Sequence, residues 1–122
     1  MAMTGRLMKT SLPVIRLLNL LRAVRELSPF DALAADEEQL LNDIILRWHV
    51  QDRLTVKEVM DDIRYPSRTT AYRRLVQLRN KGMITLDTAD HDGRIKYVCP
   101  TEASFSYVAS LEAGIEQLAR GQ

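Results

Sequence analysis

The sequence contains little of several residue types, and each shortage excludes a class of structure. Its single cysteine, Cys99, excludes an intrachain disulfide and a zinc site built from several cysteines. One cysteine is compatible with a reducing compartment, and we expect a cytoplasmic location. Cys99 lies at the end of an expected strand, where a small packed side chain is favoured over a redox sensor.

Long apolar runs are also missing. None approaches the ~20 residues that span a membrane, so no membrane association is expected. Arg16 and Asn19 interrupt the apolar residues near the N-terminus, which argues against a signal-peptide core. The two histidines, His49 and His91, lie far apart, and we identify no catalytic triad, carboxylate pair, glycine-rich phosphate loop or metal-ligand spacing. The sequence therefore predicts no catalytic residues, no metal site and no cofactor, and a protein that is not an enzyme.

The chain does contain an ordinary apolar fraction, 46%, which is too high for a disordered protein. Its 122 residues fit a single domain covering residues 1–122. The formal net charge is only +1, but basic residues concentrate in residues 1–30 and 64–81. We expect residues 1–10 to be a flexible basic arm, either a frayed terminus or a segment along a phosphate backbone.

Five helices are expected from apolar residues spaced three or four apart and from capping residues at the helix starts. Asp36 with Gln39, and Thr55 with Glu58, have the spacing of capping boxes. Gly82 has the position of a glycine that closes a helix, and Met83 can make the accompanying apolar contact. The expected helices cover residues 13–27 (after a Ser11 cap), 36–49, 56–62, 68–81 (after a Ser67 cap) and 102–119 (after a Thr101 cap).

The first and last helices have apolar faces wider than a single core contact needs. In so short a chain a second subunit covers such faces most easily, so residues 11–28 and 101–120 are interpreted as dimerisation helices. Burial in the chain's own core is the alternative. The residues expected at the dimer contact are Val14, Leu17, Leu18, Leu21, Val24, Phe105, Val108, Leu111, Ile115 and Leu118.

The fourth helix has the composition of a DNA-reading helix. Residues 64–81 hold six basic residues and no Asp or Glu. Ala71, Leu75 and Leu78 form an expected buried stripe, and the opposite face offers Arg, Thr and Tyr side chains suited to phosphates and base edges. The helix at 56–62 would support it, with Val56, Val59, Met60 and Ile63 apolar and Glu58, Asp61 and Asp62 on a solvated side. A merely solvated basic face is the alternative.

A β-hairpin is expected directly after this helix. Residues 84–88 and 94–99 alternate apolar and polar side chains, and Asp92-Gly93 is a tight-turn signal within the connecting residues 89–93. Arg94 at the base and His91 near the tip would reach an adjacent groove or the DNA backbone. Asp92 can pair with Arg94 and orient it.

Together, SRTTAYRRLVQLRNKGMI and DHDGRIKYVCPTEA resemble the winged helix-turn-helix of the MarR family of bacterial transcription regulators. The resemblance is best over residues 54–103. Asp92, Gly93 and Arg94 match the Asp-x-Arg signature of MarR-like wings, and Pro100, Thr101 and Glu102 match the lead into the last helix. The resemblance implies a mainly α fold with a small β-hairpin (α+β), in which a winged helix-turn-helix core at 36–100 is flanked by the two dimerisation helices.

The function implied is a homodimeric regulator that binds double-stranded DNA at a pseudo-palindromic operator. Many relatives respond to small phenolic or other anionic effectors, but no residue here identifies such a ligand. A winged-helix protein–protein interaction module without DNA binding is the second hypothesis. The residues expected at DNA are Ser67, Arg68, Thr69, Thr70, Tyr72, Arg73, Arg74, Arg79, His91 and Arg94.

Overall fold

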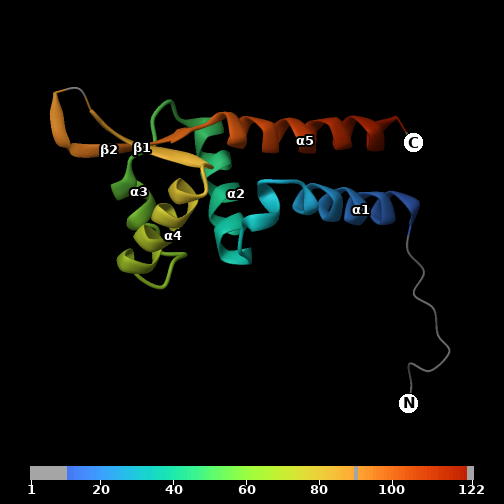
Figure 1. Ribbon diagram of the computed structural model, residues 1–122, viewed down its shortest axis with the longest axis horizontal. Helices are drawn as coiled ribbons and strands as arrows, with labels where there is room; N and C mark the ends of the chain where they lie inside the picture. Colours follow the sequence, from blue (N-terminus) through green and yellow to red (C-terminus); the bar gives the residue numbers. More distant parts are fainter. Residues whose placement is uncertain (1–10, 90, 121–122) are drawn as a thin grey trace, which may run out of the picture.

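The computed structural model describes residues 11–89 and 91–120, so the arm expected at residues 1–10 lies outside the described residues. The chain is mainly helical with one antiparallel two-stranded sheet (Figure 1). This is a winged helix, and the expected fold class is confirmed. The elements are α1 (Leu12–Glu26), η1 (Phe30–Ala32), α2 (Ala35–Val50), α3 (Val56–Met60), α4 (Arg68–Asn80), β1 (Ile84–Ala89), β2 (Asp92–Pro100) and α5 (Glu102–Ala119).

The two terminal helices project together from one side of the molecule. Figure 1 shows α1 and α5 side by side and antiparallel, while α2, α3 and α4 form a compact group and the hairpin extends from the opposite end. Gly114 of α5 permits this close approach, because a Cβ atom there would lie 2.0 Å from the side chain of Leu20 in α1. Among residues 11–89 and 91–120, no helix is long and apolar enough to cross a membrane.

The core lies between α2, α3, α4 and the base of the hairpin. Burying one aliphatic side chain of this kind contributes about 1.5–3 kcal/mol relative to leaving it in water. These contacts fix α4 against the rest of the chain. The apolar residues with at most 1% of their surface exposed are Leu40, Leu41, Ile44, Leu54, Val59, Ala71, Leu75, Leu78, Met83 and Ile84.

Side-chain caps set most helix starts, as expected. The Ser67 hydroxyl oxygen accepts a hydrogen bond from the Thr70 backbone N–H (3.0 Å) at the start of α4. Thr55 and Glu58 form the reciprocal capping box of α3, with distances of 3.1 and 2.9 Å. Ser11 and Thr101 cap α1 and α5. Each of these caps satisfies a backbone donor that has no partner within the helix.

The expected start of α2 is wrong. The helix begins at Ala35, and Glu37, not Gln39, accepts a hydrogen bond from the backbone N–H of Ala34 (2.9 Å). Ala34 has no side-chain acceptor, so only this half of a capping box forms. Asp36 lies in the first turn instead, where a carboxylate interacts favourably with the helix dipole.

The end of α4 agrees with the expectation. Gly82 has φ +80°, a conformation that glycine adopts without steric cost. Its N–H donates to the Arg79 carbonyl, and the N–H of Met83 donates to that of Leu78, both at 3.0 Å. Met83 is fully buried, so the closing apolar contact is present.

Helix α3 is shorter than expected, and two of its assignments are wrong. The helix ends at Met60 with Asp61 as its C-cap. Ile63 lies beyond the helix and is 97% exposed, so it contributes nothing to the core. Asp62 is not solvated, because its side chain is only 8% exposed and pairs with Arg47 and Arg64.

The hairpin is longer than expected and turns elsewhere. Ile84 pairs with Pro100 at the base, and Ala89 pairs with Asp92 at the tip after an irregularity beyond Thr88. The turn predicted at Asp92-Gly93 is therefore wrong, since both residues belong to β2. The base is anchored to the core, because the Trp48 indole N–H donates to the Val98 carbonyl (2.9 Å) and the Val98 N–H donates to that of Leu54 (2.7 Å).

One residue assigned to the dimer contact packs inside the chain. Val24 is 4% exposed and belongs to the core with Phe30 and Tyr107, whose rings meet edge to face at 5.2 Å. Its position on α1 faces the following short helix and α5, so Val24 offers no surface to a partner. This assignment is corrected.

Candidate nucleic-acid interface

Helix α4 has one face in the core and one in solvent. Ala71, Leu75 and Leu78 are fully buried, which fixes the rotation of the helix about its axis. On the other side Thr69 and Arg73 are exposed. Tyr72 is half-buried and packs against the core, so part of its ring supports the helix.

The first turn of α4 is held by its own side chains. The Ser67 hydroxyl accepts from the Thr70 N–H and donates to the Thr70 hydroxyl oxygen, both at 3.0 Å. Ser67 and Thr70 are therefore engaged in capping. Thr69, beside them, is exposed and makes no hydrogen bond of its side chain within the described part of the chain.

Four of the six basic residues in 64–81 are paired with carboxylates from other segments. Arg64 lies 2.7 Å from Asp62 and 3.7 Å from Asp43, and Arg68 pairs with Asp61. These acids come from α2 and from the end of α3. The absence of acids within residues 64–81 therefore overstates the positive charge of this surface.

The other two paired cations face α2. Arg74 is only 18% exposed and its Nε lies 3.3 Å from Asp36. Lys81 pairs with the buried Glu37 and donates to the Ala32 carbonyl at 2.7 Å. Arg74, expected at DNA, therefore lies on the side of α4 that packs against α2.

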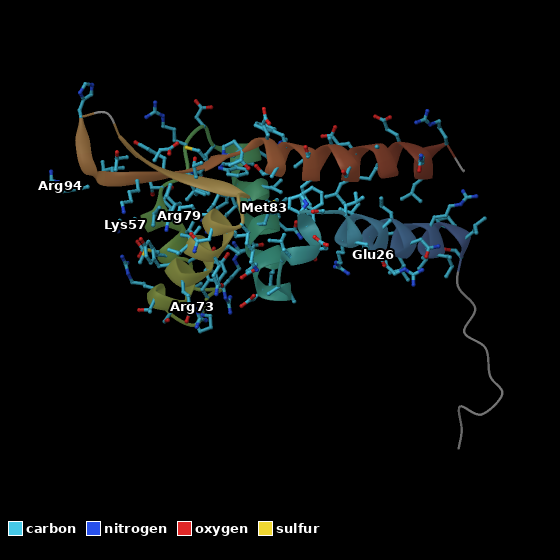
Figure 2. The ribbon with its side chains drawn as sticks, in the orientation of Figure 1. Glu26, Lys57, Arg73, Arg79, Met83 and Arg94 are labelled. Carbon is cyan, nitrogen blue, oxygen red and sulfur yellow. The ribbon has the colours of Figure 1, made fainter. Side chains whose placement is uncertain are left out.

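Arg73 and Arg79 remain. Both are exposed and have no ionic partner within residues 11–89 and 91–120. Figure 2 shows Arg73 projecting from α4 and Arg79 nearer the hairpin. An unpaired guanidinium on a rigid helix is available to a phosphate or to the acceptor edge of guanine.

The connection between α3 and α4 is held by an ionic network. Arg47 of α2 pairs with Asp62, which also pairs with Arg64, and the Tyr65 hydroxyl donates to Asp43 at 3.0 Å. The hydrogen bond from Arg64 holds the pKa of Asp62 well below its ordinary value. Burial, together with the bond to Asp43, raises the pKa of Tyr65. The network fixes the approach of the chain to α4.

The hairpin adds a second basic surface. His91 and Arg94 are exposed, and the Asp92 side chain, expected to orient Arg94, lies outside the described residues. A groove of about 410 Å³ separates β2 from α3 and the start of α4; we call it the wing groove. It is lined by Thr55, Val56, Lys57, Met60, Arg68, Arg94, Ile95 and Lys96.

Sequence reasoning missed two cations of this groove. Lys57 is on α3, which was expected only to support α4 because it carries acidic residues. Lys96 is on β2. Lys96 had a usable signal, since it lies two residues from Arg94 and residues two apart share a face of a strand. Lys57 at one wall and Arg94 on the hairpin are seen at the same end of the molecule in Figure 2.

The terminal helices leave apolar side chains exposed. Leu17 and Leu18 of α1 are 43% and 56% exposed, and Phe105 and Ile115 of α5 are 64% and 56% exposed. A pocket of about 390 Å³ lies between α1, α2 and α5, with Leu21, Val108 and Leu111 among its lining residues. The remaining expected contact residues are Val14, which is exposed, and Leu118, which is half-exposed.

Cys99 is half-buried on β2, as expected for a packed side chain. Burial, followed by a hydrogen bond to Asp87, raises the pKa of its thiol. A raised pKa leaves little reactive thiolate at neutral pH. Within the described part of the chain no group of His, Cys, Asp or Glu side chains is arranged to hold a metal ion.

The chain is similar to a protein of known structure in fold but not in sequence. No protein-family model matches the sequence, and a search of curated proteins found no match. The fold is similar to that of the heme sensor protein PefR from Streptococcus agalactiae, whose crystal structure contains heme. The TM-score is 0.58 with 21% sequence identity, over 86% of this chain and 69% of PefR. At that identity the similarity shows a shared fold.

Proposed function

We propose that this protein is a sequence-specific regulator of transcription that binds double-stranded DNA in the cytoplasm. The observation that carries the proposal is Arg73, an exposed guanidinium without an ionic partner among the described residues, on a helix whose opposite face is fully buried. A helix held in this way can enter the major groove and keep its side chains in register with the bases. The fold shared with a sensor protein supports a regulatory role.

The residues around Arg73 divide by role in this proposal. Thr69 and Arg73 read base edges, while Arg68 and Arg79 bind the phosphate backbone. Ser67 and Thr70 hold the first turn of the helix, and their hydroxyl groups form further hydrogen bonds with the phosphate backbone of the DNA. Tyr72 contacts the DNA with the exposed edge of its half-buried ring. His91 and Arg94 contact the adjacent groove or the DNA backbone there. Arg74 has a supporting role because Asp36 holds it.

We propose further that the active form is a homodimer. Apolar side chains at Leu18 and Ile115 are more than half exposed, on helices whose other faces are packed. A second copy of α1 and α5 would cover both helices, and a two-fold dimer matches a pseudo-palindromic operator with half-sites about one helical turn apart.

The direct test begins with selection of bound duplexes from a random pool. A palindromic motif is expected, and its half-site spacing gives the separation of the two α4 helices. On that motif Arg73→Ala should weaken binding by about 1–3 kcal/mol and relax the base preference. Arg79→Ala should weaken all sequences alike and reduce the salt dependence.

Arg120→Ala is the matched control for these substitutions. It removes an exposed arginine at the far end of α5, where Arg120 pairs with Glu116. Its binding should equal that of the wild-type protein. An equal loss for Arg73→Ala on every sequence would contradict base reading by this residue.

A second candidate is a protein–protein interaction module without DNA binding. It is favoured by exposed apolar residues outside α1 and α5, since Leu46 and Val50 of α2 are 66% and 76% exposed. Fluorescence anisotropy with random duplex at low salt distinguishes the two functions. Binding that weakens steeply with salt supports the regulator, whereas no binding under those conditions supports the interaction module.

The pocket between α1, α2 and α5 is our proposed site for a small effector. Its volume of about 390 Å³ suits a small molecule, and its lining is mostly apolar with the Arg25–Glu38 ion pair at one edge. Heme and small aromatic acids are suitable probes. An increase in melting temperature that is lost on substitution of Leu111→Arg, in a variant that still folds, would support the site.

A further inference from the structure

The carboxylate of Asp61 is paired with two of the cations that line the wing groove. Asp61 is the C-cap of α3, and its side chain reaches both Lys57 of the same helix and Arg68 at the start of α4. The Lys57 Nζ lies 2.8 Å from Asp61 Oδ2, and the Arg68 guanidinium pairs with Oδ1. A single acid therefore holds two of the four basic residues that line the groove.

The two ion pairs lie at the surface and are open to exchange. The side chains of Lys57, Arg68 and Asp61 are 77%, 57% and 38% exposed. Exposed ion pairs of this kind contribute little in water, because solvent screens them and long side chains lose freedom in forming them. A DNA phosphate offers the same kind of acceptor and can take over either cation.

Asp61 is negative at neutral pH with or without these partners, because the ordinary pKa of an aspartate is about 3.9. In the free protein the hydrogen bond from Lys57 lowers the pKa of the carboxyl further. It lies between α3 and α4, and the chain gives it no other cation than Lys57 and Arg68 within the described residues. A phosphate that binds these two cations leaves a negative charge beside it.

We propose that Asp61 is an internal competitor of DNA: it occupies Lys57 and Arg68 in the free protein and must give them up when a phosphate backbone enters the wing groove. This inference rests on the proposed DNA-binding function. It assigns to Asp61 a part in setting affinity that is independent of base sequence, because the groups it releases contact phosphates.

The salt dependence follows from the same exchange. A cation that binds a phosphate displaces a counterion from the DNA, and each such contact steepens the fall of affinity with salt. When the cation comes from Asp61, the carboxylate left behind attracts a counterion in turn. The net release is then smaller than the number of phosphate contacts.

The test compares wild-type protein with Asp61→Asn, binding a random-sequence duplex over a series of salt concentrations. The variant should bind about twofold to tenfold more tightly at low salt, since two weak exposed pairs no longer have to break. The slope of log affinity against log salt should become steeper by about 1 to 2. Asp61→Glu, which keeps the charge, should behave like the wild type.

Asp31→Asn is the matched control, because it removes one negative charge from an exposed side chain of η1, outside the wing groove and outside the two terminal helices. Its affinity and slope should equal those of the wild type, which excludes an effect of net charge. Unchanged or weaker binding by a folded Asp61→Asn variant, or an unchanged slope, would overturn the inference. If the wild-type protein itself does not bind duplex at low salt, the proposed function fails first, and the two failures are distinguishable.

Discussion

The winged-helix part and the pair of terminal helices cover their apolar residues differently. Leu75 and Leu78 of α4 have no exposed surface, while Leu18 of α1 and Ile115 of α5 are more than half exposed. The group of α2, α3, α4 and the hairpin thus buries most of its large apolar side chains within one chain, with exposed exceptions such as Leu46, Val50 and Ile63. Helices α1 and α5 contact each other along one side only, and the apolar residues on another side of each helix stay exposed (Figure 1).

This difference separates two sources of stability. The winged-helix part is stabilised by contacts within the chain, which do not depend on concentration. In the proposed dimer the terminal helices gain their remaining stability from a second copy, so it rises with protein concentration. Substitutions in the two regions should therefore respond differently to dilution.

The largest effect is expected for Leu75→Ala, in the centre of the buried face of α4. Loss of a fully buried leucine should reduce the free energy of unfolding by about 2–5 kcal/mol at any protein concentration. Leu18→Ala is the matched change on an exposed face. It should alter the stability of diluted protein by less than about 0.5 kcal/mol and weaken self-association instead. Urea unfolding at several concentrations, with sedimentation, measures both; equal effects would contradict the comparison.

Gly114→Leu should open the contact between the terminal helices. The new side chain collides with Leu20, whose three nearest side-chain atoms lie 2.0, 2.7 and 2.9 Å from the added Cβ position. A cost of about 1–3 kcal/mol is expected, together with faster hydrogen exchange in α1 and α5 and unchanged protection in α4. Ala113→Leu, at an exposed neighbouring position, should leave exchange unchanged. Loss of protection throughout the chain would show that the two regions unfold together.

Thr101→Ala tests the junction between the regions. The Thr101 hydroxyl oxygen accepts from the Ser104 N–H (3.3 Å) at the start of α5, and the hydroxyl donates to the Gly82 carbonyl (2.7 Å) after α4. Loss of such a cap costs about 1 kcal/mol. Thr69→Ala, at an exposed position of α4, should cost much less. Chemical denaturation of the two variants provides the comparison.

The last and smallest effect depends on pH. The pKa of Asp62 is held below its ordinary value, chiefly by the hydrogen bond from Arg64, so its charged form stabilises the folded state. That contribution is complete above the unfolded pKa of about 3.9 and is lost as pH falls below it. Asp62→Asn should therefore be less stable than the wild type near neutral pH, by a margin that shrinks below about pH 4. A margin independent of pH would contradict this assignment.

Features set by neighbouring residues could be predicted from the sequence. The caps at Ser67 and Thr101 and the closing glycine at Gly82 act within a few residues, so the bounds of α4 and α5 follow closely. Local signals competed at two places. Glu37 took the capping role expected of Gln39, and the Asp92-Gly93 pair, typical of tight turns, lies within β2.

The candidate site was less predictable, because several of its basic residues pair with acidic residues that are distant in the sequence. Arg74 and Lys81 belong to a segment without acids, yet Asp36 and Glu37 come to lie beside them from α2. A composition window along the sequence does not contain such pairs. The buried stripe of α4 was predicted correctly and leaves Arg73 exposed. The pairing of Arg74 depends instead on how α2 packs beside α4, because its partner Asp36 belongs to α2.

The pairing at the base of the hairpin has a consequence for how this protein can vary. Ile84 lies opposite Pro100, and the Gly82 carbonyl accepts from the Thr101 hydroxyl, so the chain leaves and returns at nearly the same point. Residues 84–100 thus form a hairpin whose two ends lie side by side between α4 and α5. Insertions or deletions at its tip need not move either helix, so the reach of the hairpin can be lengthened or shortened while the helices keep their relative placement.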